Sequence, residues 1–196
     1  MPTVGRRDLV MLVIGLGAGD ELNDSLGGIT RLQKYLFLLD REAAVQADRD
    51  GFRFEPYKAG PYSAKVYDDL EFLENLGLLQ SHVTGSATEE EAAEVERLSI
   101  GDLFDTPAAS GVGSNVEDTV APEERRFFLT DPGVAHVKRL LDNPEYRPVV
   151  DAVRRIKSRF AGHSLDDLLF YVYTKFPEMT TESEIRTKVL RRGRSR

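Results

Sequence analysis

Cysteine is absent from this chain of 196 residues, and histidine occurs only three times. Without a thiol, the chain forms neither a disulfide nor a thiolate metal site, and it has no cysteine nucleophile. The histidines lack the H-x-x-x-H or H-E-x-x-H spacing of a zinc site and lie in separate segments, at His82, His136 and His163. We therefore expect no metal, no cofactor and no enzymatic activity.

Long hydrophobic runs are also missing. The apolar stretch that begins at Leu9 has about ten residues, whereas a membrane-spanning helix needs about 20. The basic start resembles a secretory signal only faintly, because Asp8 adjoins the apolar stretch and no A-x-A cleavage site follows. We expect a cytoplasmic protein that does not associate with membranes.

Charge is distributed unevenly around a net value of −7. Residues 1–124 contain 10 Lys or Arg against 24 Asp or Glu, a net charge of −14, whereas residues 125–196 contain 16 against 9, a net charge of +7. An acidic chain disfavours nonspecific binding to nucleic acid, but its basic C-terminal third is able to bind an anion locally. A surface whose charges have no specific role is an equally open interpretation.

Hydrophobic periodicity predicts three helices in the first 80 residues. The first covers residues 6–16 and ends in a run of glycines. The second covers residues 29–39, where apolar side chains occupy most positions, so we expect it at the centre of the core. The third begins after Ser63, which we expect to cap it, and ends near residue 76. Gly77 then stands where a helix C-terminus favours a left-handed residue.

An acidic stretch separates two predicted strands. Residues 52–57 favour a short strand or extended segment before the Gly60-Pro61 turn, and residues 78–83 begin a further strand. Residues 84–124 contain 11 Asp or Glu and a single Arg, which predicts a solvated insertion. Residues 125–130 resume as a strand.

The last third of the chain predicts several helices. One covers residues 131–141, with Thr130 or Asp131 as its cap, and a second follows Pro148. Two pairs have the spacing of a capping box: Ser164 with Asp167 before a helix at 165–175, and Thr181 with Glu184 before a last basic helix.

This order of elements predicts a mainly α-helical winged helix-turn-helix with a small β-hairpin. We expect a winged-helix domain at residues 1–141, with residues 84–124 as an acidic and flexible insertion in its wing. Residues 142–196 then form a C-terminal helical extension with a basic tail.

Three segments carry a resemblance to known proteins. They are Gly-Ile-Thr-Arg-Leu-Gln-Lys-Tyr-Leu-Phe-Leu at 28–38, Phe-Glu-Pro-Tyr-Lys-Ala-Gly-Pro-Tyr-Ser at 54–63 and Leu-Glu-Asn-Leu-Gly-Leu at 73–78. Through these segments, roughly residues 8–80 resemble prokaryotic winged-helix proteins of the YwgA-like group and, more distantly, Panacea-domain antitoxins. The resemblance implies a regulator or a partner-binding module and brings no catalytic residues.

The Leu-Gln-Lys helix and the Gly-Pro turn form the structural motif of this resemblance. We expect Gln33 and Lys34 to hydrogen-bond the loop at residues 57–63 and to set its geometry. This contact can be a structural staple or can shape a binding surface. The motif residues are Arg31, Gln33, Lys34, Gly60 and Pro61.

Other chemistries fit less well. The glycines at residues 15–19 resemble a dinucleotide-binding turn, but the pattern fails at Asp20, whose charge would face the phosphate. Ser63 has no identifiable base, so capping explains it better than nucleophilic catalysis. The carboxylates Asp68, Asp69, Glu71 and Glu74 are interpreted as a solvated helix face.

Two functions remain. The first is a transcription regulator that binds double-stranded DNA, as a homodimer formed through its C-terminal helices. The helix at 63–76 would be its recognition helix, although this helix carries four carboxylates and only its N-terminal end suits DNA. The second is an antitoxin-like or defence-associated module that binds a basic protein partner, a toxin or an effector, and no DNA. Candidate contact residues for either are Lys58, Tyr62, Ser63, Lys65, Arg125 and Arg126.

Overall fold

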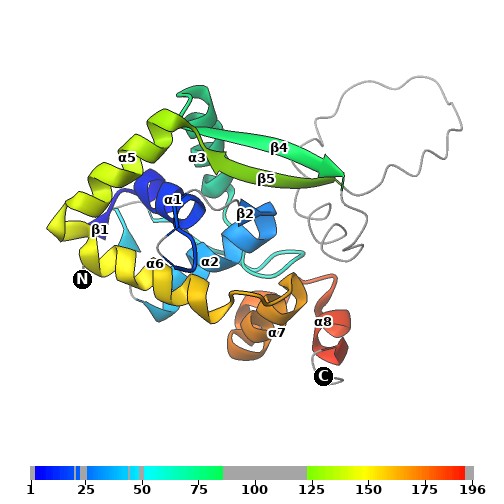
Figure 1. Cartoon of the computed structure of the whole chain (residues 1–196). Helices are drawn as coiled ribbons and strands as arrows, with labels where there is room; N and C mark the ends of the chain where they lie inside the picture. Colours follow the sequence, from blue (N-terminus) through cyan, green and yellow to red (C-terminus); the bar gives the residue numbers. More distant parts are fainter. Residues whose placement is uncertain are drawn as a thin grey trace, which may run out of the picture.

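The computed structural model describes residues 3–19, 21–22, 26–43, 45–48, 51–85 and 123–192. These residues form a mainly helical protein with a small three-stranded antiparallel sheet. Figure 1 shows two of the helices, α5 and α6, along one side of the molecule and the strands β4 and β5 extending from the other side. Among the described residues, no helix is long and apolar enough to cross a membrane.

Three helices of the first 80 residues are present at the predicted positions. They are α1 (Arg6–Gly15), α2 (Ile29–Glu42) and α3 (Ala64–Asn75). The third ends as predicted, with Gly77 in the left-handed region at φ +67°, where the amide of Leu78 donates to the carbonyl of Leu73.

The sheet has one strand more than the sequence predicts. The hairpin strands β4 (Leu79–Gly85) and β5 (Glu123–Leu129) pair antiparallel, and β2 (Leu26–Gly27) pairs with the other edge of β5, which gives the order β2-β5-β4. A separate pair, β1 (Thr3–Val4) with β3 (Gln46–Ala47), is parallel. The paired strands reach residues 85 and 123, so the expected break at 84–124 is too wide at both ends; residues 86–122 lie outside the described residues.

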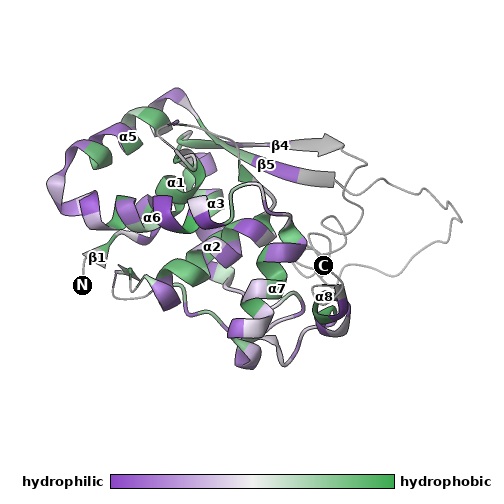
Figure 2. Ribbon diagram, turned by 60° about the horizontal axis from the view of Figure 1, so that its bottom comes forward, coloured by the Kyte–Doolittle hydropathy of each residue, from purple (hydrophilic) through white to green (hydrophobic). Residues whose placement is uncertain are grey.

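The last third of the chain is helical, as predicted. Its elements are α5 (Asp131–Asp142), the 3-10 helix η2 (Pro144–Tyr146), α6 (Arg147–Arg159), α7 (Leu165–Lys175), the 3-10 helix η3 (Pro177–Thr180) and α8 (Arg186–Arg192). Figure 2 shows hydrophilic and hydrophobic residues alternating along α5 and α6, as expected for helices that cover a core with one face.

One hydrophobic core joins both parts of the chain. The helix α2 packs against α1, α6 and α7, and its residues from Leu32 to Leu39 are all buried. The predicted position of this helix at the centre of the core is confirmed. The last helices contribute Val153, Leu168 and Val189 to the same cluster.

A close approach of two backbones fixes the start of α5. Thr130 caps α5 by accepting from the amide of Gly133, and its hydroxyl donates to the carbonyl of Gly77 at 2.6 Å. A Cβ atom on Gly133 would lie 2.0 Å from the carbonyl oxygen of Leu78. The glycine therefore allows α5 to pack directly on the chain that leaves α3.

Candidate functional site

The turn at residues 57–63 is held by α2 from one side. The side chain of Gln33 donates to the carbonyl of Ser63 and accepts from its amide, both at 3.0 Å, and Lys34 donates to the carbonyl of Pro61 at 3.0 Å. All four residues are buried. The contacts that the sequence predicts for Gln33 and Lys34 are therefore present, and they fix the direction in which the chain enters α3.

The C-terminal segment holds the same turn from a second side. The carbonyl of Lys58 accepts from the hydroxyl of Ser183 and from the amide of Glu184, both at 3.0 Å. The Ser183 hydroxyl donates its only proton to the carbonyl of Lys58. It therefore accepts a hydrogen bond from the hydroxyl of Tyr173, at 2.7 Å. Burial raises the pKa of Tyr173 to about 12, although its hydrogen bond with Ser183 acts in the opposite direction.

Gly60 makes this second contact sterically possible. Its φ is +85°, and a Cβ atom there would lie 2.8 Å from the Tyr173 ring. A side chain at residue 60 would therefore be strained and would also collide with a buried ring. No sequence pattern pointed to Tyr173 or Ser183, which are 113 and 123 positions further along the chain than Gly60.

The predicted capping role of Ser63 is wrong. Ser63 does occupy the N-cap position of α3, but its hydroxyl donates to the carbonyl of Phe52 and makes no cap hydrogen bond. The Ser63 hydroxyl is therefore bound by the extended segment before the turn and is not available to cap the helix. As a result, the first turn of α3 has no side-chain cap and can accept an anion at its N-terminus.

Positive charges gather around this helix start. Lys58 is in the turn and Lys65 in the first turn of α3, and both are half-buried. The helix α8 begins two residues after Glu184, whose amide is bound to Lys58. Its first turn carries two further cations, Arg186 and Lys188.

Aromatic rings line the same turn. Tyr62 stacks between Tyr57, with ring centroids 4.7 Å apart, and Tyr67 of α3, at 5.8 Å, and the ammonium of Lys58 lies 5.9 Å from the Tyr57 centroid. Burial and the carboxylates of Glu55 and Asp68 raise the pKa of Tyr62.

The carboxylates of α3 are not all solvated, contrary to expectation. Asp69 is fully buried and is bound by the guanidinium groups of Arg6, with one contact at 2.9 Å, and Arg7, at 3.2 Å. Asp68 and Glu71 are exposed and Glu74 is half-buried. The outer face of α3 therefore carries less negative charge than the sequence suggests.

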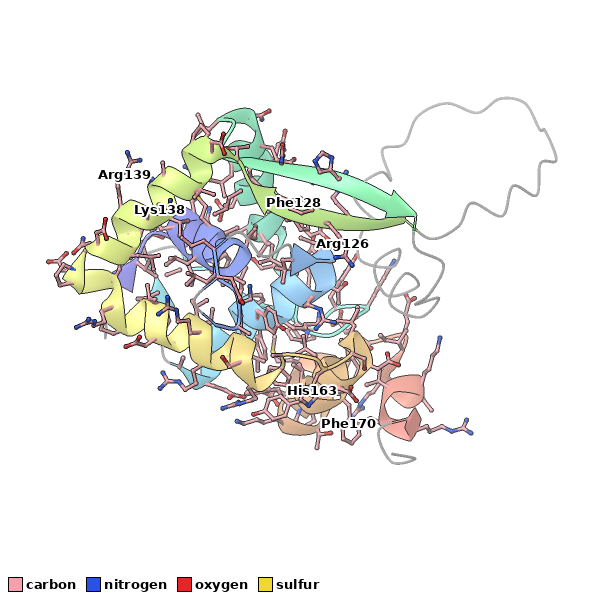
Figure 3. The ribbon with its side chains drawn as sticks, viewed as in Figure 1. Arg126, Phe128, Lys138, Arg139, His163 and Phe170 are labelled. Atoms are coloured by element: carbon pink, nitrogen blue, oxygen red, sulfur yellow. The ribbon has the colours of Figure 1, made fainter. Side chains whose placement is uncertain are left out.

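The predicted contact residues of the hairpin lie on a separate element. Arg125 and Arg126 are consecutive on β5, so their side chains point to opposite faces of the sheet. Arg126 stands opposite His82 in the register, and Figure 3 shows it with Phe128 on β5. Lys58, Ser63 and Lys65 thus belong to the turn and the start of α3, whereas the two arginines belong to β5.

The remaining predicted residues take structural positions. Arg31 donates to the carbonyl of His163 at 3.3 Å, which joins α2 to the start of α7. His136 lies 2.7 Å from Asp8, and Tyr146 donates to the same carboxylate at 3.1 Å. Within the described ranges, no three His, Cys, Asp or Glu residues are grouped so as to hold a metal ion.

Comparison with known proteins adds no relative, since no family model, curated protein or solved structure matches this chain.

Proposed function

We propose that this chain is a winged-helix protein that binds double-stranded DNA as a transcription regulator. Contact would involve the first turn of α3, the turn at residues 57–63 and α8. The observation that carries this proposal is the anchoring of the basic C-terminal segment to the carbonyl of Lys58, in the turn that precedes α3.

The topology supports the winged-helix part of the proposal. In that fold a short strand between the first two helices pairs with the last strand of a hairpin, and the helix before the hairpin is the recognition helix. Here β2 lies between α1 and α2, pairs with β5, and α3 directly precedes β4. The relation to YwgA-like and Panacea-domain proteins stays a prediction.

The charge distribution limits how DNA would bind. Phosphate contacts supply most of the affinity, so cations must face the backbone. The cations stand at the N-terminal end of α3, whereas Asp68 and Glu71 are exposed further along it. We therefore expect α3 to contact DNA with its first turn only, while α8 binds the adjacent phosphates.

Salt-titrated binding tests the proposal. The affinity of the full chain for a random duplex of about 30 base pairs would be measured between about 50 and 300 mM salt. Replacing Lys58 and Lys65 by alanine removes two phosphate contacts, so the slope of log K against log salt should become shallower by about 1.8.

A matched variant controls for overall charge. Lys138 and Arg139 are exposed on α5, and Figure 3 shows them on the side of the molecule away from α8. Their double alanine variant changes the net charge equally but should leave the slope unchanged. Equal losses in the two variants, or no binding even at the lowest salt, would overturn the proposal. Homodimer formation stays a prediction that sedimentation of the same sample can test.

A further inference from the structure

The outer face of α3 combines exposed apolar side chains with negative charge. Phe72 and Leu76 are 38% and 58% exposed, and they are the large hydrophobic residues that the described part of the chain leaves exposed. They are four residues apart and so lie on the same flank of the helix. Asp68 and Glu71, both exposed, lie beside them.

Tyrosines border the opposite flank of this face. Tyr67 is half-buried and stacks with Tyr62, which continues the aromatic surface onto the turn. The acidic ridge of Asp68 and Glu71 thus runs between two apolar or aromatic borders. Aromatic residues are enriched in protein-binding surfaces, whose apolar centre has a polar border.

A cation already occupies part of this face. The guanidinium of Arg7 lies over the Phe72 ring, 3.4 Å from its centroid, and also binds the buried carboxylate of Asp69. The Arg7 side chain remains 46% exposed. This contact shows the chemistry that suits the surface, namely a cation stacked on a ring with a carboxylate beside it.

We propose that this α3 face, defined by Asp68, Glu71, Phe72 and Leu76, binds a basic amphipathic helix of another protein. The partner would place apolar side chains on Phe72 and Leu76 and pair Arg or Lys with Asp68 and Glu71. The negative charge of this face favours a basic partner over the alternatives. A second copy of the chain would bring two acidic ridges together, and both DNA and an anionic lipid surface would be repelled.

The site is distinct from the proposed DNA contact, which uses the first turn of α3. The acidic face belongs to the last two turns of the helix. One helix would then contact DNA at its beginning and a protein at its end, and loss of either activity would leave the other measurable.

A designed peptide tests the proposal on the full chain. The probe is a fluorescein-labelled helix of about 16 residues, long enough to span α3, with leucines on one face and arginines on the other. A second peptide carries glutamate in place of arginine. We expect the arginine peptide to bind, the glutamate peptide to fail, and Leu76→Ser to weaken binding by about tenfold, the loss of one buried apolar contact.

Charge variants separate a local site from general attraction. Asp68→Asn with Glu71→Gln should weaken the arginine peptide by about tenfold. The matched control, Asp142→Asn with Asp151→Asn, removes two exposed charges from α5 and α6 and should leave binding unchanged.

Three results would overturn the proposal. They are equal weakening by the control pair, equal binding of the glutamate peptide, and unchanged binding by Leu76→Ser. Light scattering on the chain without peptide tests whether a second copy of the chain binds this face instead. If the chain is a dimer and Leu76→Ser converts it to a monomer, a second copy occupies the face. That result would overturn the proposal of a different protein partner.

Discussion

Gln33 and Ser63 exchange two hydrogen bonds of 3.0 Å each, so the side-chain amide pairs with the backbone as a neighbouring strand would. Both residues are buried, and water cannot replace either bond. The carbonyl of Ser63 also accepts from the amide of Val66, but its own amide donates to Gln33. The Leu-Gln-Lys helix therefore provides the acceptor for the buried N–H group of Ser63.

Replacing this glutamine should destabilise the fold. In Gln33→Met the volume is nearly kept, but the Ser63 amide loses its acceptor, so the free energy of unfolding should fall by about 2–3 kcal/mol. Urea denaturation measures it. Gln80→Met, at an exposed position of β4, serves as the control and should change it by less than about 0.5 kcal/mol. Similar losses of unfolding free energy in the two variants would show that the hydrogen bonds between Gln33 and Ser63 do not stabilise the fold.

Gly60 and Gly77 form a second matched pair. Both have positive φ, at +85° and +67°, but a Cβ atom would meet the Tyr173 ring only at Gly60 and nothing within 4 Å at Gly77. Gly77→Ala should cost about 1 kcal/mol of unfolding free energy, from backbone strain alone. Gly60→Ala adds a collision with a buried ring and should cost about 3 kcal/mol. Thermal unfolding measures both, and equal shifts would show that Tyr173 moves aside freely.

Asp69 provides a third prediction. It is buried and bound to two arginines, whereas its neighbour Asp68 is exposed. Asp69→Asn removes the buried negative charge to which Arg6 and Arg7 are bound, so we expect a loss of about 3 kcal/mol in unfolding free energy. Asp68→Asn should be close to neutral. If the two substitutions cost the same in denaturant titrations, the ion pair does not join α1 to α3.

Sequence patterns predicted the local structure well where one short segment determines it. Ser164 and Asp167 form the predicted capping box at the start of α7. The identical spacing of Thr181 and Glu184 predicted wrongly, because Thr181 follows η3 in a helical conformation and α8 begins only at Arg186. The amide of Glu184 instead binds Lys58, a contact across 126 positions that no local pattern encodes.

The errors at the candidate site have the same physical origin. A serine before a helix usually caps it, but Ser63 finds the carbonyl of Phe52 on the extended segment beside it. A carboxylate on an amphipathic helix is usually solvated, but α1 brings Arg6 and Arg7 to Asp69. Periodicity thus positioned α3 along the chain, whereas tertiary contacts decided which of its polar groups remain available for binding.

Glu42 and Asp40 should give stability a pH dependence of opposite sign. Burial acts to raise the pKa of Glu42, but hydrogen bonds from Tyr171, at 2.7 Å, and from Lys175 and Arg159 lower it overall. Partial burial raises the pKa of Asp40, whose side chain is 43% exposed, and the charge of Arg41 only partly offsets this. Both carboxylates are near the end of α2, so α2 offers a comparison within one helix.

The sign follows from which state holds the proton more tightly. For Glu42 the folded pKa is the lower one, so its stabilisation is complete above the unfolded pKa, about 4.3, and is lost as pH falls through the folded value. Glu42→Gln should therefore be less stable than the parent at pH 7, and the difference should vanish on acidification. Asp40 has the higher pKa when folded, so Asp40→Asn should gain stability at pH 7 and lose that gain in acid. Urea titrations at several pH values measure both, and a difference for Glu42→Gln that persists unchanged into acid would show that its partners hold it by shape rather than by charge.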